Sequence, residues 1–212
     1  MKKLLIVIVA VGGLIYFLRK SSPSRAENVS FEAAYTLKTE SGISVSGPHV
    51  EETSLVVDKD RFALHSTIKG SYGSVDERWT VYNGEKIQGK FVHHPGPEDE
   101  ESEGMTEPSV YSRELSETEL HNLRFWSRSF LGEAGPGGKI AGRDTTLYQA
   151  RNNMPDSTIT VQAWVDSETG IVLKSVKSVY AKQVEDLLNK ETVECKSIRY
   201  GPVEDSAFAP PR

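Results

Sequence analysis

From residue 31 onward, apolar and polar residues alternate with a period of two in short stretches, and turn-forming residues separate these stretches. Successive side chains of a β-strand point to opposite faces, so the alternation predicts strands with one apolar and one polar face. In the first such strand, one face carries Phe31, Ala33, Tyr35 and Leu37. The apolar face must be covered, which restricts the chain to a mainly β fold with another layer packed on that face.

Turn signals show which strands are paired. Asp58-Lys59-Asp60 separates 50–58 from 61–69, and Asn83-Gly84 separates 77–82 from 86–92. Asn-Gly between alternating stretches is the strongest short-range signal for a β-hairpin. Each of the two segment pairs is therefore predicted to be a hairpin.

A further hairpin is predicted at 164–174, which reads Trp-Val-Asp-Ser-Glu-Thr-Gly-Ile-Val-Leu-Lys. Gly170 can supply the positive φ that such a turn needs, and the acidic turn residues Asp166 and Glu168 are expected to be solvated. We expect further strands at 139–151, 158–166, 171–180 and 191–200. The total is about nine or ten strands, in an antiparallel α+β or half-barrel arrangement.

A single helix is predicted in the middle of this pattern. Ser116 and Glu119 have the spacing of a capping box, in which each side chain bonds to the backbone N–H of the other residue. We expect the helix to run to Gly132, with its apolar stripe against the strands. The stripe consists of Leu120, Leu123, Trp126, Phe130 and Leu131. Segment 132–138 is expected to be flexible, and 181–190 to form one or two helical turns.

The N-terminal segment has the pattern of an export signal. Met1-Lys2-Lys3 precedes fifteen uncharged residues, 4–18. As a helix these would span about 22 Å, less than the roughly 30 Å of a bilayer core, which favours a signal peptide. Arg19-Lys20 favours a retained anchor, because basic residues resist translocation. Residues 1–26 are thus predicted to be a signal peptide or membrane anchor with a linker, and 27–212 one domain in the cell envelope, outside the cytoplasm.

The charge of the chain excludes one class of ligand, and its cysteine content excludes an intrachain disulfide. The net charge is −5, and residues 1–26 contain five basic residues and no acidic residue, so the rest of the chain carries −10. The charge of −10 on residues 27–212 excludes nucleic acid as a ligand, because its phosphates require a basic surface. The single cysteine, Cys195, allows no intrachain disulfide and is expected to be a buried thiol on a strand.

Sequence motifs for catalysis are absent. The chain has no Gly-x-Ser-x-Gly elbow, no His-Glu-x-x-His and no phosphate-binding loop, so we expect neither an enzyme nor a cofactor. A hydrolase would need His65 or His121 to meet a serine and an acid in space. His93 and His94 would point to opposite faces of a strand, and the acidic run 98–103 is expected to be a solvated loop, so no metal site is predicted.

Three segments resemble motifs of the LolA/LolB/RseB-like outer-membrane lipoprotein-sorting superfamily. Segment 139–148 resembles its V-x-G-R-x-T-Y strand, 164–174 its W-[IV]-D-x-x-T-G-x-x-L-[KR] hairpin, and 203–211 its terminal D-x-x-F-x-x-P. The resemblance implies an unclosed antiparallel half-barrel with a helical lid on its concave face. In lipoprotein carriers of this superfamily the cavity holds acyl chains, and other members are stress sensors.

We therefore expect a cell-envelope protein that holds a lipid, an acyl chain or another hydrophobic ligand, in lipid or lipoprotein transport. The partners would be a lipid or an acylated protein, and the membrane through the N-terminal segment. The alternative is a membrane-anchored sensory domain with a filled core that binds another envelope protein. The expected cavity lining is Tyr35, Leu37, Leu55, Phe62, Leu64, Trp79, Phe91, Trp126, Phe130 and Trp164.

Overall fold

The structure is a computed structural model that describes residues 29–42, 49–70, 73–96, 108–130, 132–182 and 186–209. In these residues eleven strands form one sheet. Six precede the lid: β1 (Phe31–Ser41), β2 (His49–Asp58), β3 (Arg61–Lys69), β4 (Val75–Tyr82), β5 (Lys86–His94) and β6 (Ser109–Glu114). Five follow it: β7 (Glu133–Ile140), β8 (Arg143–Asn153), β9 (Ser157–Asp166), β10 (Val172–Ala181) and β11 (Leu187–Tyr200).

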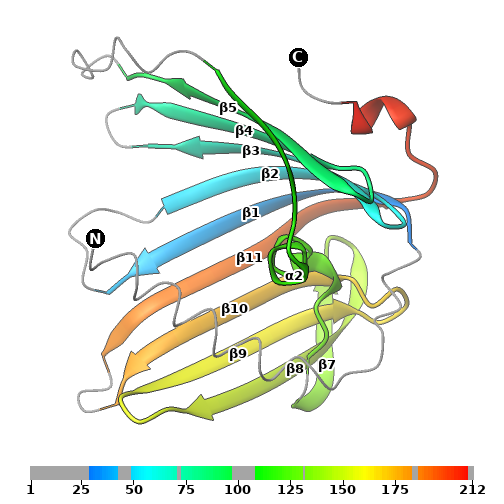
Figure 1. Cartoon of the computed structure of the whole chain (residues 1–212). Helices are drawn as coiled ribbons and strands as arrows, with labels where there is room; N and C mark the ends of the chain where they lie inside the picture. The colour runs from blue at the N-terminus through cyan, green and yellow to red at the C-terminus, as the bar shows by residue number, and fades with distance from the viewer. Residues whose placement is uncertain are drawn as a thin grey trace.

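The sheet is antiparallel and unclosed, with the order β6-β5-β4-β3-β2-β1-β11-β10-β9-β8-β7. Each half is a run of consecutive strands, and β1 joins the two halves by pairing with β11, from Phe31 opposite Tyr200 to Ser41 opposite Asn189. Figure 1 shows the sheet curving away from this central pair on both sides. The predicted fold class, a mainly β half-barrel with a helical lid, is confirmed.

The lid consists of α2 (Glu117–Leu123) and η3 (Phe125–Ser127), which follow β6 and lie against one face of the sheet (Figure 1). The predicted capping box at Ser116 is confirmed, but the prediction that the helix continues to Gly132 is wrong. Arg124 leaves the helical region at φ −81° and ψ 51°, because Phe125 and Trp126 turn onto the sheet instead of continuing the helix.

Three other predictions about elements are wrong, and one strand was missed. β6 was not expected, and segment 132–138, expected to be flexible, forms most of β7. Segment 139–151 is divided between two strands by a turn at Ala141 and Gly142. The stretch expected to form helical turns at 181–190 contains the end of β10 and the start of β11. In each case cross-strand pairing prevails over a weak local signal.

The hairpin predictions are confirmed. β2 pairs with β3 from Asp58 opposite Arg61, and β4 pairs with β5 from Tyr82 opposite Ile87. β9 pairs with β10 around Gly170, whose φ is +78°. At the Asn-Gly site the Asn83 carboxamide accepts hydrogen bonds from the backbone N–H groups of Glu85 and Lys86. This bond pattern is an Asx turn, which explains why an asparagine occurs there.

The register divides the side chains of the sheet between two faces. The inner face, on which the lid lies, carries Phe31, Ala33, Tyr35 and Leu37 from β1. The partners of these residues on β2 and β3 share that face, and they include Leu55, Val57, Phe62 and Leu64. The hydrophobic core lies between this inner face and the lid.

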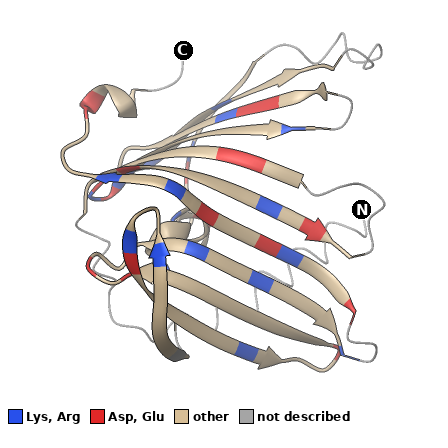
Figure 2. Cartoon of the chain, turned by 180° about the vertical axis from the view of Figure 1, so that it is seen from behind, with Lys and Arg blue, Asp and Glu red and all other residues tan. Residues whose placement is uncertain are grey.

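The outer face of the central strands is polar and charged. Ion pairs connect Lys174 to Glu194, Lys190 to Glu40, and Arg199 to Glu32. Figure 2, which views the molecule from behind, shows acidic and basic residues interspersed along these strands. The outer face therefore has the character of a solvated surface, while the inner face carries the apolar core residues.

The predicted signal or anchor at 1–26 lies outside the described residues, as does most of the acidic loop. Within the described ranges, no helix is long and apolar enough to cross a bilayer.

Candidate ligand-binding face

Aromatic side chains connect the lid to the sheet. The Trp126 ring packs edge-to-face on Phe62 with 5.2 Å between centroids, and Phe125 packs in the same way on Tyr35 at 5.1 Å. Trp126 is 2% exposed, whereas no residue of α2 is buried. The two aromatic residues of η3 therefore hold the lid on the inner face, together with Leu120 and Leu123 of α2, which are half-buried against the core.

Most of the residues predicted to line the cavity lie on the inner face or in the lid. Tyr35, Leu55, Phe62 and Trp126 belong to the buried core, and Leu37 and Leu64 are half-buried against it. Phe91 also lies on the inner face. It is opposite Arg78, and Arg78 is opposite Ser66, which is two residues after Leu64 and so shares its face. Phe130 is half-buried in the segment after η3 and is not part of the core cluster.

The prediction that Trp79 and Trp164 line the cavity is wrong, because both lie on the outer face. Trp79 is opposite His65, which directly follows the inner-face residue Leu64 and therefore points to the outer face. The rings of Trp79 and His65 stack with 4.6 Å between their centroids. Trp164 is opposite Lys174, whose ammonium lies 5.4 Å from the indole centroid. Apolar alternation predicts that residues share a face, but it does not show which face is covered.

Polar bonds in the core fix the position of Tyr35. Its hydroxyl donates to the backbone carbonyl of Val172 at 3.0 Å, and burial raises its pKa well above the ordinary value. Cys195 lies opposite Tyr35 on β11 and is buried, as predicted, and burial raises the pKa of its thiol to about 11. Both groups stay protonated at neutral pH, so neither is an activated nucleophile.

A polar group under the lid was not predicted. Arg128 donates to the backbone carbonyl of Asn122 at 3.1 Å, while its Nε is buried and has no hydrogen-bond partner in the described part of the chain. Desolvation lowers the pKa of Arg128, and the charge of Glu191 opposes that shift. Glu191 lies opposite Lys177 with 3.8 Å between the charged atoms. These residues are far apart in sequence, so no sequence motif predicts that they meet.

The lid is also tethered at its surface. Arg113 on β6 forms an ion pair with Glu119 at 2.8 Å, and Arg124 donates to the backbone carbonyl of Asp60 at 2.7 Å. The bond from Arg113, together with those from Ser116, lowers the pKa of Glu119 to about 2. These contacts are solvent-exposed and contribute little each, so the apolar contacts dominate the attachment of the lid.

The hairpin at 164–174 is held by Asp166, which is 1% exposed, so the prediction of a solvated side chain is wrong for this residue. Its carboxylate accepts hydrogen bonds from the backbone N–H groups of Glu168 and Thr169, from Arg143 Nε at 2.8 Å and from the Tyr200 hydroxyl at 2.8 Å. Desolvation acts to raise the pKa of Asp166, but these donors lower it below the ordinary value. Asp166 therefore has a structural role.

His93 and His94 pair with acidic side chains on opposite faces of β5. The Nδ1 of His93 lies 2.6 Å from the Asp76 carboxylate on the inner face. The Nε2 of His94 lies 3.7 Å from the Glu77 carboxylate on the outer face. Across the described ranges, no three His, Cys, Asp or Glu side chains gather in a geometry that could hold a metal ion.

No protein-family model and no curated protein matches the sequence. The solved structures that are similar to the chain include the following two. The crystal structure of MucB in complex with MucA(peri) has 18% identity and a TM-score of 0.34, and the alignment covers 94% of this chain and 59% of that one. The chain thus spans about three fifths of the length of the MucB chain.

The second structure is the LolA superfamily protein NE2245 from Nitrosomonas europaea. It has 9% identity and a TM-score of 0.33, and the alignment covers 89% of this chain and 98% of that one. Both likenesses concern the fold alone.

Proposed function

We propose that this chain is an extracytoplasmic binding protein that holds a lipid, an acyl chain or another hydrophobic ligand between the inner face of the half-barrel and the lid. The proposed role is in lipid or lipoprotein transport in the cell envelope, without catalysis. The observation that carries the proposal is the way the lid is attached: Phe125 and Trp126 contact the inner face, while α2 has no buried residue.

The magnitudes support a reversible exchange between these side chains and a ligand. Two large aromatic side chains bury about 300–500 Å², which corresponds to roughly 8–12 kcal/mol at the usual coefficient. An acyl chain with about fourteen methylenes has a similar transfer free energy, roughly 11 kcal/mol. An acyl chain could therefore replace Phe125 and Trp126 on the inner face without a large net change in free energy.

Trp126 provides a direct test, since the other two tryptophans lie on the outer face. In the double variant Trp79→Phe/Trp164→Phe, Trp126 is the only tryptophan and reports on the lid. We expect its emission to change saturably on titration with palmitate or with an acylated peptide. An unchanged spectrum would contradict the proposal.

A charge on the inner face should abolish this response. Leu64 is half-buried on the inner face, so Leu64→Glu would place a carboxylate where the ligand lies. Ser54→Glu is the matched control, because Ser54 is exposed on the outer face of the neighbouring strand, opposite His65. We expect the control to keep the response. Far-UV circular dichroism of both variants tests whether they fold.

The alternative is a domain that binds another envelope protein and keeps its interior filled. The observation that favours it is the dense packing under the lid, where Tyr35, Phe62 and Trp126 are each at most 2% exposed. In that case the Trp126 emission would not respond to any acyl ligand. The same titration therefore separates the two functions.

A further inference from the structure

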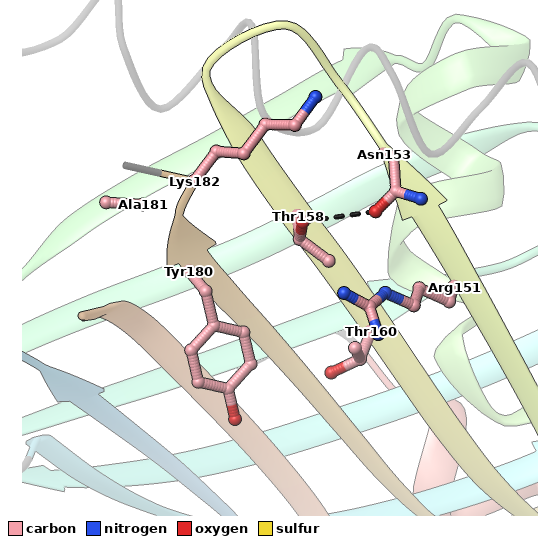
Figure 3. Close-up of a pocket in the computed structure, with 7 residues that line it drawn as sticks. All are labelled: Arg151, Asn153, Thr158, Thr160, Tyr180, Ala181 and Lys182. Atoms are coloured by element: carbon pink, nitrogen blue, oxygen red, sulfur yellow. Dashed lines mark hydrogen bonds between the residues drawn. The ribbon is translucent and has the colours of Figure 1, made fainter. Parts of the chain in front are cut away.

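A polar pocket of about 590 Å³ lies on the outer face, away from the lid. It is formed where β8, β9 and β10 approach the β8–β9 turn, and Figure 3 shows its lining. The register explains why these side chains lie together: Arg151 is opposite Thr160, and Asn153 is opposite Thr158, which is opposite Tyr180.

Six of the seven described residues that line the pocket have a side chain that can donate a hydrogen bond. Thr158 donates to the Oδ1 of Asn153 at 3.1 Å, which leaves the amide N–H groups of Asn153 available. Within the described part of the chain, the Lys182 ammonium makes one long hydrogen bond, 3.4 Å, to the backbone carbonyl of Met154. The hydroxyls of Thr160 and Tyr180 add two more groups that can donate, and among the described residues no carboxylate lines the pocket.

Arg151 differs from other arginines of the surface. Arg61, Arg143 and Arg199 form ion pairs with acidic side chains, whereas the Arg151 guanidinium forms neither an ion pair nor a hydrogen bond with any described residue. In Figure 3 it extends over Thr160 toward the strand that carries Tyr180. An unpaired guanidinium beside an ammonium and neutral donors is complementary to an oxyanion.

We propose that this pocket binds a phosphate group, either as free phosphate or as a phosphate ester. Arg151 would donate two parallel hydrogen bonds to the phosphoryl oxygens, and Lys182 would supply a second positive charge. Thr160 and Tyr180 would fix the orientation of the group. The volume exceeds that of phosphate, so the pocket also has room for the alcohol part of an ester. This site is independent of the inner face and of the function proposed above.

The test uses the full-length chain in a neutral detergent and isothermal titration calorimetry. The probes are inorganic phosphate, glycerol 3-phosphate and mixed micelles that contain phosphatidylglycerol. We expect saturable binding of at least one probe. Binding of inorganic phosphate supports free phosphate as the source, and binding of glycerol 3-phosphate alone supports a soluble ester. Binding of the micelles alone supports a lipid headgroup.

The double variant Arg151→Gln/Lys182→Gln removes both charges from the pocket. We expect it to bind the successful probe at least about tenfold more weakly. The matched control is Arg199→Gln/Lys38→Gln, which makes the same change of net charge on the same face away from the pocket. Affinity in this control should stay within about twofold of the unmodified chain. Tyr180→Phe should weaken binding by a few-fold, since it removes one hydroxyl.

Two results would overturn the proposal. One is the absence of saturable binding for all three probes. The other is an equal loss of affinity in the two double variants, because that result would show a general effect of charge. Arg151, Lys182 and Arg199 are exposed and Lys38 is half-buried with its ammonium at the surface, so thermal unfolding of both variants should match the unmodified chain and exclude a folding defect.

Discussion

At the scale of single residues, the most constrained side chain is Asp166. It is a buried carboxylate with four hydrogen-bond donors, two of them backbone N–H groups of its own turn. Removal of one partner from a buried charged network leaves the other partners unsatisfied, which is far more costly than loss of an exposed ion pair.

We predict that Asp166→Asn lowers the free energy of unfolding by about 3 kcal/mol at neutral pH. Glu168 shares the Arg143 partner but is 78% exposed, so Glu168→Gln should change stability by less than about 0.5 kcal/mol. Urea unfolding measures both. Equal effects of the two substitutions would contradict the role assigned to Asp166.

The pH dependence of stability gives a second test of the same residue. Because the pKa of Asp166 is lowered in the folded state, its contribution is complete above the ordinary Asp pKa. That contribution is lost as the pH falls through the folded value. Between about pH 5 and pH 2, the unmodified chain should therefore lose more stability than Asp166→Asn. Parallel curves would show that Asp166 does not titrate in this way.

At the scale of elements, the turn between β7 and β8 is the clearest case of local strain. Ala141 has φ +49° and Gly142 has φ +78°, so both residues lie in the left-handed region. Glycine adopts this region freely, whereas alanine does so at a cost of about 1–2 kcal/mol. Two-residue hairpin turns with both residues at positive φ favour Asn-Gly.

We predict that Ala141→Asn stabilises the chain by about 0.5–1 kcal/mol, because asparagine tolerates the left-handed region better. Gly142→Ala should destabilise it by about 1 kcal/mol. An added Cβ at Gly142 would meet no atom within 4 Å, so this cost comes from the backbone conformation alone. Shifts of the urea midpoint in opposite directions for the two variants would confirm the left-handed conformation of the turn. Shifts in the same direction would contradict it.

Some elements could be predicted from the sequence and others could not. Strands at β1 to β5 and the hairpin after Trp164 follow from alternation and turn residues, because both signals are local. β6 was missed because its residues, Ser109–Glu114, are almost all exposed and show no apolar face. The early end of α2 was missed because contacts of Phe125 and Trp126 with the sheet decide it.

The candidate site was predictable only in part for the same reason. Alternation identifies Tyr35, Phe62 and Leu64 as members of one face, and the lid confirms that face as the inner one. It also predicts an apolar face around Trp79, but the register places this face outside. Arg128 and Glu191 are brought together by the lid and β11, and no local pattern contains that information.

At the scale of the whole molecule, the two halves of the sheet depend on one strand pair. β1 and β11 lie at the centre, whereas β6 and β7 are edges that pair on one side only. The buried core residues of the sheet come mostly from the central strands, and β6 is almost fully exposed. Stability should therefore decrease from the centre to the edges.

We predict this gradient in amide hydrogen exchange. Amides of β1, β2, β10 and β11 should exchange only through global unfolding, while those of β6 and β7 should exchange through local opening. Mass spectrometry of peptic fragments resolves the difference. Equal protection of β6 and β1 would contradict the gradient and would indicate that the edges are covered in solution.

Native mass spectrometry of the full-length chain, released from the membranes of its own host in a mild detergent, tests the central claim most directly. We predict a bound mass in the lipid range on the unmodified chain and on Ser54→Glu, and its loss on Leu64→Glu. A clean mass without ligand on the unmodified chain, with no uptake of added phospholipid or acylated peptide, would contradict the proposed function. That result would favour the filled, protein-binding alternative.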